Sequence, residues 1–224
     1  MPDWLQRLAG LVLSVLTLPL VVILVIVIRA DSIGPGIHRA ERIGRGGHLF
    51  TCFKLRTMRI DSISGPSITA PADPRISRVG RAIRRSRLDE LPQLWNVVRG
   101  DMRLVGPRPE SPTFADLHDE RSRRVFMATP GITGLTQLLF IDETSLLTGG
   151  DPDEIYRTRV LPGKIEVDAA YLDRRSMRLD LWILLRTLRT IARGGIDLAA
   201  VEEHLCVPLA LARAALSPEG GADE

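Results

Sequence analysis

The sequence is poor in cysteine, which limits the covalent and metal chemistry it can support. Its 224 residues include two cysteines, Cys52 and Cys206, and neither belongs to a Cys-x-x-Cys pair. This argues against a disulfide framework and favours a reducing compartment. The four histidines also lack the spacing of a zinc site. We therefore expect neither disulfides nor a cysteine–histidine metal centre.

Several familiar nucleotide-binding and hydrolase signatures are missing as well. The sequence contains no Walker loop, no Rossmann glycine fingerprint and no Gly-x-Ser-x-Gly elbow. Aromatic residues make up 4% of the chain, and none supplies a stacking partner beside its arginine-rich helix. Nucleic-acid binding is therefore not expected.

Lysine is nearly absent, whereas arginine is common. Lys54 and Lys164 are the only lysines among 30 basic residues, and the formal net charge is +3. A modest positive charge suits an anionic membrane surface or ligands that carry phosphate. The planar guanidinium group of arginine is especially suited to phosphate.

Charge is missing altogether from residues 8–28, which are strongly apolar. At about 1.5 Å per residue, a helix of this length could cross the ~30 Å hydrocarbon core of a bilayer. The run is too long for an ordinary signal peptide, and Arg29-Ala30-Asp31 is a poor cleavage site. A buried core helix of this kind would need a larger protein around it. We expect a membrane-anchoring helix within residues 1–30.

Pro19 lies near the middle of this run and predicts a kink, because proline removes a backbone hydrogen bond. A kinked helix could still span the membrane, or it could re-enter the face from which it came. Basic residues flank both ends, with more of them on the C-terminal side. Under either topology this bias places the following domain on the cytoplasmic face.

Residues 31–195 are expected to form one small, mostly helical α+β domain, with residues 196–224 as an extension whose end is disordered. The pattern predicts a β-hairpin from residues 36–42 and 48–58, joined by the turn glycines of Gly44-Arg45-Gly46-Gly47. A loop rich in Ser, Pro and Ala follows at residues 62–74. Helices are predicted at residues 76–87, 89–99, 110–127 and 171–192.

The last predicted helix carries an apolar stripe. The leucines at positions 181, 184, 185 and 188 recur at helical spacing. We expect this stripe to pack inside the domain, with contact to lipid as the alternative.

The helix predicted at residues 89–99 is the most informative segment. Asp89 and Glu90 fall at its start, where free backbone N–H groups and the helix dipole favour ionised carboxylates. Such a carboxylate can act as a nucleophile or bind Mg²⁺, although ordinary helix capping needs the same residue type. Gly100 is expected to end the helix. Helical spacing predicts a buried face made of Leu91, Leu94, Trp95 and Val98.

Arginines surround this carboxylate pair in sequence. Arg84 is one of four arginines just upstream, and downstream Arg108 stands between two prolines that fix its backbone. Carboxylates beside several arginines suit a complex of a diphosphate with a metal ion. Some of these arginines could instead form a solvated face or contact lipid headgroups.

Five sequence motifs occur in a fixed order along the chain. They are Arg42-Ile43-Gly44-Arg45-Gly46-Gly47, Phe53-Lys54-Leu55-Arg56-Thr57-Met58, residues 86–102, Leu104-Val105-Gly106-Pro107-Arg108-Pro109 and Pro130-Gly131-Ile132-Thr133-Gly134. Together they resemble the monotopic bacterial sugar transferases, which are polyprenyl-phosphate phosphoglycosyltransferases. The resemblance runs from about Trp4 to Gly195.

The resemblance implies an activity and a place. Asp89 would attack the sugar-bearing phosphate of a UDP-sugar, release UMP and form a covalent phosphosugar enzyme. Polyprenyl phosphate, such as undecaprenyl phosphate, would then accept the sugar phosphate and begin a surface glycan. The partners implied are the UDP-sugar, the polyprenyl phosphate and membrane lipids, at the cytoplasmic face of the bacterial inner membrane.

The resemblance also implies roles for individual residues. Glu90 would assist Mg²⁺ binding or proton handling, with Asp89 and Glu90 as the metal carboxylates. Lys54, Arg84 and Arg108 match positions that would contact phosphates.

The sequence departs from the family pattern in two places. Family members break the membrane helix at a Ser-Pro pair, whereas this chain has Leu18-Pro19, with Thr17 as a possible substitute for the serine. The family's Gln-Val-Asn-Gly-Arg-Asn segment is replaced here by residues 137–143, so no sugar specificity is inferred. The alternative to an enzyme is a catalytically silent membrane scaffold for glycan assembly, and the intact pair of Asp89 and Glu90 argues against it.

Overall fold

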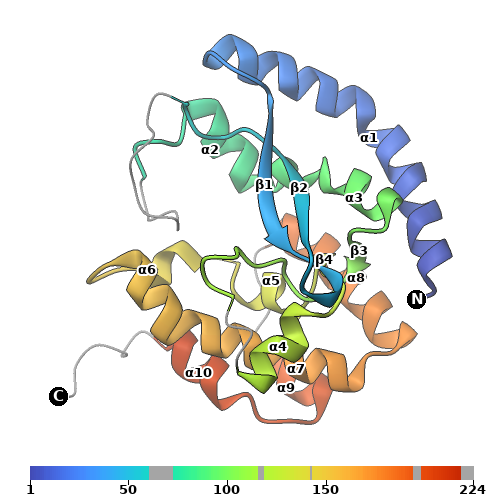
Figure 1. Ribbon diagram of the computed structural model, residues 1–224, viewed down its shortest axis with the longest axis vertical. Coiled ribbons are helices and arrows are strands. Elements are labelled where there is room, and N and C mark those ends of the chain that lie inside the picture. The colour runs from blue at the N-terminus through green and yellow to red at the C-terminus, as the bar shows by residue number, and fades with distance from the viewer. Residues whose placement is uncertain (61–72, 116–118, 142, 194–197, 218–224) are drawn as a thin grey trace. The chain divides into compact units, whose positions relative to one another are not determined.

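The computed structural model of the chain describes residues 1–60, 73–115, 119–141, 143–193 and 198–217 (Figure 1). This part divides into two compact units. Unit 1 contains residues 1–60, 73–115 and 126–132, and unit 2 contains the remaining described residues. Helices predominate, and an antiparallel hairpin lies in unit 1. The predicted α+β class, with an N-terminal apolar helix, is confirmed.

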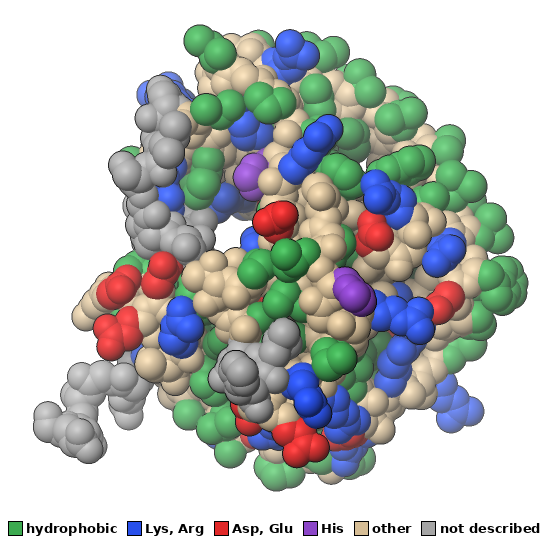
Figure 2. Space-filling view, in the orientation of Figure 1, with side chains coloured by type: hydrophobic (Ala, Val, Ile, Leu, Met, Phe, Trp, Pro, Cys, Tyr) green, Lys and Arg blue, Asp and Glu red, His purple; other side chains and the backbone are tan. Residues whose placement is uncertain are grey.

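Helix α1 is continuous from Asp3–Asp31 and contains the whole apolar run. Within the described residues it is the one helix long and apolar enough to cross a membrane. Most of its apolar side chains are exposed, and Figure 2 shows green side chains gathered over α1. A large exposed apolar surface typically marks a site of contact with a membrane or with another protein. Length and exposure together favour contact with lipid.

Pro19 lies inside α1, whose axis bends part-way along its length (Figure 1). Proline deprives the carbonyl four residues earlier, that of Val15, of its helical hydrogen bond. The Thr17 hydroxyl instead donates to the carbonyl of Leu13 at 2.7 Å. Thr17 therefore does not satisfy the carbonyl that the proline leaves free, and the suggestion that it substitutes for the family serine is wrong.

The first turns of α1 pack against helix α3 (Gln93–Arg99) and strand β3 (Arg103–Val105). The buried Gln6 side chain accepts a hydrogen bond from the Leu104 backbone N–H at 2.9 Å. Gly10 lies so close to Val97 that a Cβ atom there would be 3.0 Å from the valine side chain. A polar residue and a glycine thus attach the start of an otherwise apolar helix to unit 1.

The last turn of α1 is held by the buried arginine Arg56. Its guanidinium donates to the backbone carbonyls of Ile28, Ser32 and Ile33. Ile28 lies in the last turn of α1, and Ser32 and Ile33 directly follow the helix, so the arginine binds the chain where the helix ends. Beside it, Ile28 packs with Leu55 and Ile83 in a small apolar core.

The predicted hairpin is confirmed. Strands β1 (Ile37–Ile43) and β2 (Leu49–Leu55) pair antiparallel, with Ile37 opposite Leu55 and Ile43 opposite Leu49. The turn is the short 3₁₀ helix η1 (Arg45–Gly47), in which Gly46 has a φ of 70°, as expected for a turn glycine. The loop predicted at residues 62–74 lies almost entirely outside the described residues.

Helix α2 (Arg78–Arg85) is shorter than the predicted helix at residues 76–87. Ser77 begins it, since the serine hydroxyl accepts a hydrogen bond from the Gly80 N–H at 2.9 Å. The chain then enters a 3₁₀ turn, η2 (Leu88–Glu90), before α3 begins at Gln93. Asp89 and Glu90 therefore lie in a separate turn rather than in the first turn of the helix.

The buried face of α3 also differs from the prediction. Leu94 is buried as expected, but the other buried positions are Gln93, Asn96 and Val97, while Trp95 is exposed. The helical spacing was predicted correctly, but the buried face is rotated relative to the prediction. The reason is that Asn96, a polar residue, is buried where it forms hydrogen bonds with β2. Gly100 ends α3 with a φ of 89°, as predicted.

The helix predicted at residues 110–127 is much shorter in the structure. Residues 110–115 are not helical, residues 116–118 lie outside the described part, and α4 covers only Glu120–Phe126. The carbonyl of Glu110 accepts a hydrogen bond from the hairpin N–H of Ile43 instead. Strand β3 pairs with β4 (Gly131–Thr133) in a second, two-stranded sheet.

Unit 2 is helical. It contains nearly all of α4, followed by α5 (Leu135–Leu139), η3 (Glu143–Leu146), α6 (Pro152–Ile155), the π-helical turn η4 (Tyr156–Val160), α7 (Leu161–Arg174), α8 (Met177–Arg193), α9 (Leu198–Leu205) and α10 (Ala210–Leu216). Helix α10 packs against α7 where a glycine, Gly163, permits close approach to Ala212. The segment from residue 218, predicted to be disordered, lies outside the described residues.

The helix predicted at residues 171–192 is two elements, the end of α7 and most of α8. The chain breaks between them at Arg175 and Ser176, and the Ser176 hydroxyl accepts a hydrogen bond from the Leu179 N–H. The Tyr171 hydroxyl donates to Asp180 at 2.7 Å, which ties the two helices together. The sequence pattern did not reveal the boundary between the two helices, because only two residues separate them.

The apolar stripe on α8 is largely exposed, so the expectation that it packs inside the domain is wrong. Leu181 and Leu185 are 54% and 53% exposed, and Leu188 is more exposed still. The buried positions are instead Leu179 and Ile183, with Asp180 between them. Contact of this stripe with lipid stays a prediction.

Candidate active site

The two predicted site carboxylates lie side by side on the turn η2, between α2 and α3. Arg87 begins the turn with a φ of 58°, in the left-handed region. A residue other than glycine is uncommon in this region and costs of order 1 kcal/mol there, and such residues cluster at functional sites. The left-handed conformation of Arg87 changes the direction of the backbone after α2, so that Asp89 and Glu90 lie beside strand β2 of the hairpin.

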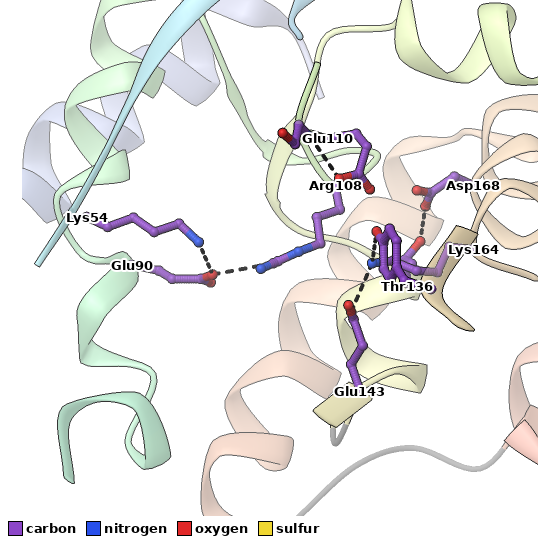
Figure 3. A network of polar contacts seen from close by, with 10 residues as sticks. Lys54, Glu90, Arg108, Glu110, Thr136, Glu143, Lys164 and Asp168 are labelled. Atoms are coloured by element: carbon purple, nitrogen blue, oxygen red, sulfur yellow. Dashed lines mark hydrogen bonds and ion pairs between the residues drawn. The ribbon is translucent and has the colours of Figure 1, made fainter. Parts of the chain in front are cut away.

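Glu90 is the centre of an ion-pair cluster. Its Oε1 atom lies 3.2 Å from Lys54 Nζ and 3.3 Å from Arg108 Nη1 (Figure 3). The Glu90 side chain is only 14% exposed. Burial by itself would raise its pKa, but the charges of Lys54, Arg108 and Arg87 outweigh burial and hold the pKa at about 2. Glu90 is therefore ionised throughout the physiological pH range.

Asp89 has the opposite electrostatic environment. Burial raises its pKa above the ordinary value of 3.8, and the neighbouring charge of Glu90 raises it further. The charges of Lys54, Arg84 and Arg108 only partly offset this rise. Within the described residues Asp89 accepts no hydrogen bond, so its carboxylate is not committed to a partner. Adjacent carboxylates with divergent pKa values are a common sign of divided chemical roles.

Arg84 reaches the site from α2. Its Nε donates to the Thr57 hydroxyl at 2.7 Å, and burial lowers the pKa of the guanidinium while the nearby Asp89 raises it. Helix α2 approaches closely because Gly80 has no side chain: a Cβ atom there would lie 2.0 Å from the Thr57 carbonyl oxygen. Gly80 and Thr57 thus fix the position of Arg84.

Arg108 lies in the loop after β3, and two of the sequence motifs meet to hold it. The N–H of Gly131 donates to the carbonyl of Pro107 at 2.8 Å. Gly106 and Gly131 face each other so closely that a Cβ atom on Gly131 would lie 2.1 Å from the Gly106 nitrogen. This backbone contact explains why the motif around Arg108 needs the later Pro-Gly motif.

Lys54 comes from β2, which an asparagine attaches to α3. The buried Asn96 accepts from the Phe53 N–H at 3.1 Å and donates to the Thr51 carbonyl at 2.7 Å. Sequence reasoning missed this residue, although an asparagine among apolar helix positions was a usable signal. All five predicted site residues belong to unit 1, and the structure gathers them around η2.

His38 is a further residue that sequence reasoning set aside. It pairs directly across the hairpin with Lys54, and opposed residues in a β-ladder share one face. Burial lowers its pKa, and the positive charges of Arg42, Lys54 and Arg84 lower it further. A neutral imidazole therefore lies beside the cationic group.

The balance of charge determines what this site can bind. Three cationic side chains face two carboxylates, and one of those carboxylates has a raised pKa. The surplus of positive charge suits an anionic ligand such as a diphosphate. A carboxylate without a partner beside such a ligand is placed to attack phosphorus.

Whether the site could hold a magnesium ion depends on which ligand side chains it offers. No group of three or more His, Cys, Asp or Glu side chains gathers anywhere in the described ranges. Mg²⁺ is commonly held by one or two carboxylates together with substrate phosphates and water, so two carboxylates are sufficient. Asp89 and Glu90 fit this pattern, although Glu90 already binds two cationic side chains.

Fold and site together define a protein with an N-terminal helix able to cross a membrane and a cationic carboxylate centre suited to phosphate esters. Sequence comparison specifies the family. Residues 2–194 match the family described as bacterial sugar transferase, and the chain belongs to that family. The predicted resemblance is confirmed.

Curated relatives carry related names. A UDP-glucose:undecaprenyl-phosphate glucose-1-phosphate transferase of Caulobacter vibrioides is 38% identical, over 82% of this chain and 66% of the relative. A UDP-N-acetylgalactosamine-undecaprenyl-phosphate N-acetylgalactosaminephosphotransferase of Aeromonas hydrophila is 37% identical, over 84% and 42%. An undecaprenyl-phosphate galactose phosphotransferase of Salmonella typhimurium is 35% identical, over 85% and 41%. The chain spans two thirds or less of these relatives, whose names specify three different sugars.

Proposed function

We propose that the chain transfers a sugar phosphate from a UDP-sugar to a polyprenyl phosphate, and so begins the assembly of a surface glycan. Membership of the bacterial sugar transferase family supports the reaction class, and the names of the relatives support undecaprenyl phosphate as the acceptor. The observation that carries the proposal is Asp89, a half-buried carboxylate that accepts no hydrogen bond among the described residues and lies beside three cationic side chains.

The proposed reaction has two displacements at one phosphorus atom. A carboxylate oxygen of Asp89 attacks the sugar-bearing phosphorus, and the bond from that phosphorus to the bridging oxygen breaks, so UMP leaves with the electron pair. A phosphate oxygen of the polyprenyl phosphate then attacks the same phosphorus. The bond to Asp89 breaks, which regenerates the carboxylate and yields a lipid diphosphate sugar.

The cationic side chains would stabilise the charge that develops during both steps. Lys54 and Arg108 form ion pairs with Glu90 and would bind phosphate oxygens when a donor enters. Arg84 is held near Asp89 by Thr57 and would contact the phosphate under attack. Such preorganised charges are often the largest single contribution to catalysis.

Glu90 would keep these cations in place. Its ion pairs with Lys54 and Arg108 fix two flexible side chains at the site before substrate binds. With Asp89 it would also hold Mg²⁺, which supplies Lewis-acid charge to the donor diphosphate.

A donor-only experiment tests the covalent step. The purified full chain, incubated with a UDP-sugar and Mg²⁺ but without lipid acceptor, is expected to release one UMP and gain the mass of one sugar phosphate. Rapid quenching and intact-mass measurement detect the adduct. Asp89→Asn should form none, whereas the surface control Asp173→Asn should react normally, because its exposed ion pair with Arg124 contributes little.

The test uses a panel of UDP-sugars, because the sugar is not specified. If UMP appears only when polyprenyl phosphate is also present, transfer is direct and the covalent route is refuted. If no UDP-sugar gives UMP under any condition, the silent scaffold becomes the better description.

We further propose that α1 re-enters the membrane, so that Met1 and the catalytic residues both lie on the cytoplasmic side. Both ends of α1 make polar contacts with unit 1, through Gln6 at the start and Arg56 at the end. A helix that crossed the bilayer would present its ends to opposite faces. The bend in α1, which contains Pro19, favours the same topology.

Single cysteines at the exposed positions Pro2 and Pro35 test this topology. The background replaces the buried Cys52 with alanine and the exposed Cys206 with glycine, which suits its φ of 55°. Both probes should resist an impermeant thiol reagent on whole cells and react after lysis. Labelling of the Pro2→Cys probe from outside would establish a crossing helix.

A further inference from the structure

A second group of arginines lies in unit 1, around a small pocket at the start of α1. The pocket is lined by Asp3, Gln6, Arg7, Arg45, Gly100, Met102, Arg103 and Thr129. Three arginines face one aspartate, which leaves a formal charge of +2. None of these residues belongs to the proposed catalytic cluster. Arginines gathered with too few carboxylates indicate an anion site, because their mutual repulsion needs a counter-charge.

Arg103 is the most enclosed of the three. Its Nη2 atom pairs with the Asp3 carboxylate, and its side chain is 16% exposed. Its Nη1 atom is buried and has no hydrogen-bond partner among the described residues. A buried N–H group without an acceptor costs about 1–3 kcal/mol. An anion in the pocket would supply the missing acceptor.

Arg7 and Arg45 complete the pocket. The Arg7 guanidinium lies directly on Gly100, where a Cβ atom would be 2.1 Å from its Nη2 atom. Gly100 has a φ of 89°, so both its backbone and its missing side chain are needed for this approach. Neither Arg7 nor Arg45 makes an ion pair within the ranges that the structure describes.

The position of the pocket indicates the source of the anion. Arg7 immediately precedes the apolar residues 8–28, so it lies about 1.5 Å along the helix from Leu8. On α1, Trp4 is 67% exposed and Leu8 is also exposed. Tryptophan is enriched at the level of lipid headgroups. A pocket beside these residues lies where acyl chains end and phosphates begin.

We propose that this pocket binds the phosphate of an anionic phospholipid headgroup, such as phosphatidylglycerol. A guanidinium pair can hold two oxygens of a phosphodiester, and the net charge of +2 favours a headgroup without a compensating ammonium. The bound lipid would fix the start of α1 against β3. The inference depends on insertion of α1 in a membrane but not on the transferase reaction.

Lipid binding to the full chain in a neutral detergent tests the proposal, with native mass spectrometry as the readout. The probes are dioctanoyl phosphatidylglycerol, dioctanoyl phosphatidylcholine, inorganic phosphate and farnesyl phosphate. Arg7→Gln and Arg45→Gln should each weaken phosphatidylglycerol binding about tenfold or more, as for a lost hydrogen bond between charged groups. Arg29→Gln is the matched control, because Arg29 is an exposed arginine at the other end of the apolar run. It should change binding less than about twofold, since distant charges are screened.

The probes distinguish the possible sources of phosphate. Preference for phosphatidylglycerol over phosphatidylcholine, without displacement by the two soluble phosphates at equal concentration, supports the proposal. Displacement by inorganic phosphate would make this a free-phosphate site, and displacement by farnesyl phosphate would make it an acceptor site. Either result overturns the proposal, as does an equal loss in Arg29→Gln. Arg45 is exposed on a turn, so its variant should fold even if Arg7→Gln does not.

Discussion

Units 1 and 2 each contain a carboxylate–lysine cluster, and the two clusters differ in how their charges are balanced. In unit 1, Glu90 pairs with Lys54 and Arg108. In unit 2, Lys164 lies 2.9 Å from Glu143 (Figure 3). Its ammonium group also lies 2.8 Å from the Tyr156 hydroxyl. The Lys164 side chain is 5% exposed, whereas that of Lys54 is 20% exposed.

The difference in charge balance distinguishes a candidate ligand site from a structural ion-pair cluster. The Lys164 cluster matches one positive charge with one negative charge and adds a hydroxyl and an aromatic face, since Lys164 also lies over the Tyr156 ring. The cluster around Glu90 has more positive than available negative charge and includes the uncommitted Asp89. We interpret the balanced cluster as structural and the unbalanced cluster as a candidate ligand site, because carboxylates with perturbed pKa values concentrate at functional sites.

Removal of the uncommitted carboxylate should have the largest effect. Asp89→Asn is expected to lower turnover at least about a thousandfold, roughly 4 kcal/mol of barrier. Because burial raises the Asp89 pKa, the ionised form is disfavoured in the folded state, so the neutral variant should be as stable as wild type or more stable at pH 7. UMP release and thermal unfolding measure the two effects. Turnover within about tenfold of wild type would refute the nucleophile assignment.

The balanced cluster should respond to mutation through stability. Lys164→Met removes the ion pair between Lys164 and Glu143 and is expected to cost on the order of 3 kcal/mol of unfolding free energy. Lys54→Met should cost clearly less, because Glu90 keeps Arg108, but it should impair turnover. Urea unfolding of both variants makes the comparison. Equal losses of stability would remove the distinction between the clusters.

A smaller effect is expected from Glu90→Gln, on the pH dependence of the covalent step. Asp89 must be ionised to attack, so the rate should fall as the pH drops through its pKa, which lies above 3.8. Glu90→Gln removes a negative charge that raises this pKa and should therefore shift the acidic limb to lower pH, by less than about one unit or ~1.4 kcal/mol. Single-turnover rates, normalised to each variant's own plateau, give the shift. An unchanged or higher limb would mean that Glu90 does not set the Asp89 pKa.

The smallest effect is expected at the surface of unit 2. Leu185→Ala on α8 should change stability by no more than about 0.5 kcal/mol and leave turnover in detergent unchanged, because Leu185 is exposed. Ile183→Ala, on the buried side of the same helix, should cost roughly 2–4 kcal/mol. If Leu185→Ala reduces turnover, unit 2 contributes more to function than a stable fold.

Much of the site was predictable because its residues are neighbours in sequence or fall in recurring motifs. The sequence motifs predict five candidate site residues, and the structure gathers all of them in unit 1: Asp89, Glu90, Lys54, Arg84 and Arg108. Their roles in the reaction stay predictions. The supporting residues were less accessible to sequence reasoning.

The residues that were missed act across long sequence separations. Asn96 bonds β2 more than forty positions away, and His38 is opposed to Lys54 only through the hairpin register. Thr57 holds Arg84 by a single hydrogen bond. A local pattern could mark Asn96 as unusual among apolar helix positions, but it does not identify the partners of these residues, because those are set by how the elements pack.

Local sequence is sufficient to predict the long apolar helix, the hairpin with its glycine turn, the end of α3 at Gly100 and the candidate site residues. Each depends on local chemistry: residue hydropathy, the freedom of glycine at positive φ, or residue types in a fixed motif. Tertiary structure alone decided which faces of α3 and α8 are buried, and which of two adjacent carboxylates is neutralised. Helical period fixes which residues share a face but not which face meets a partner, and a pKa depends on charges that only folding brings together.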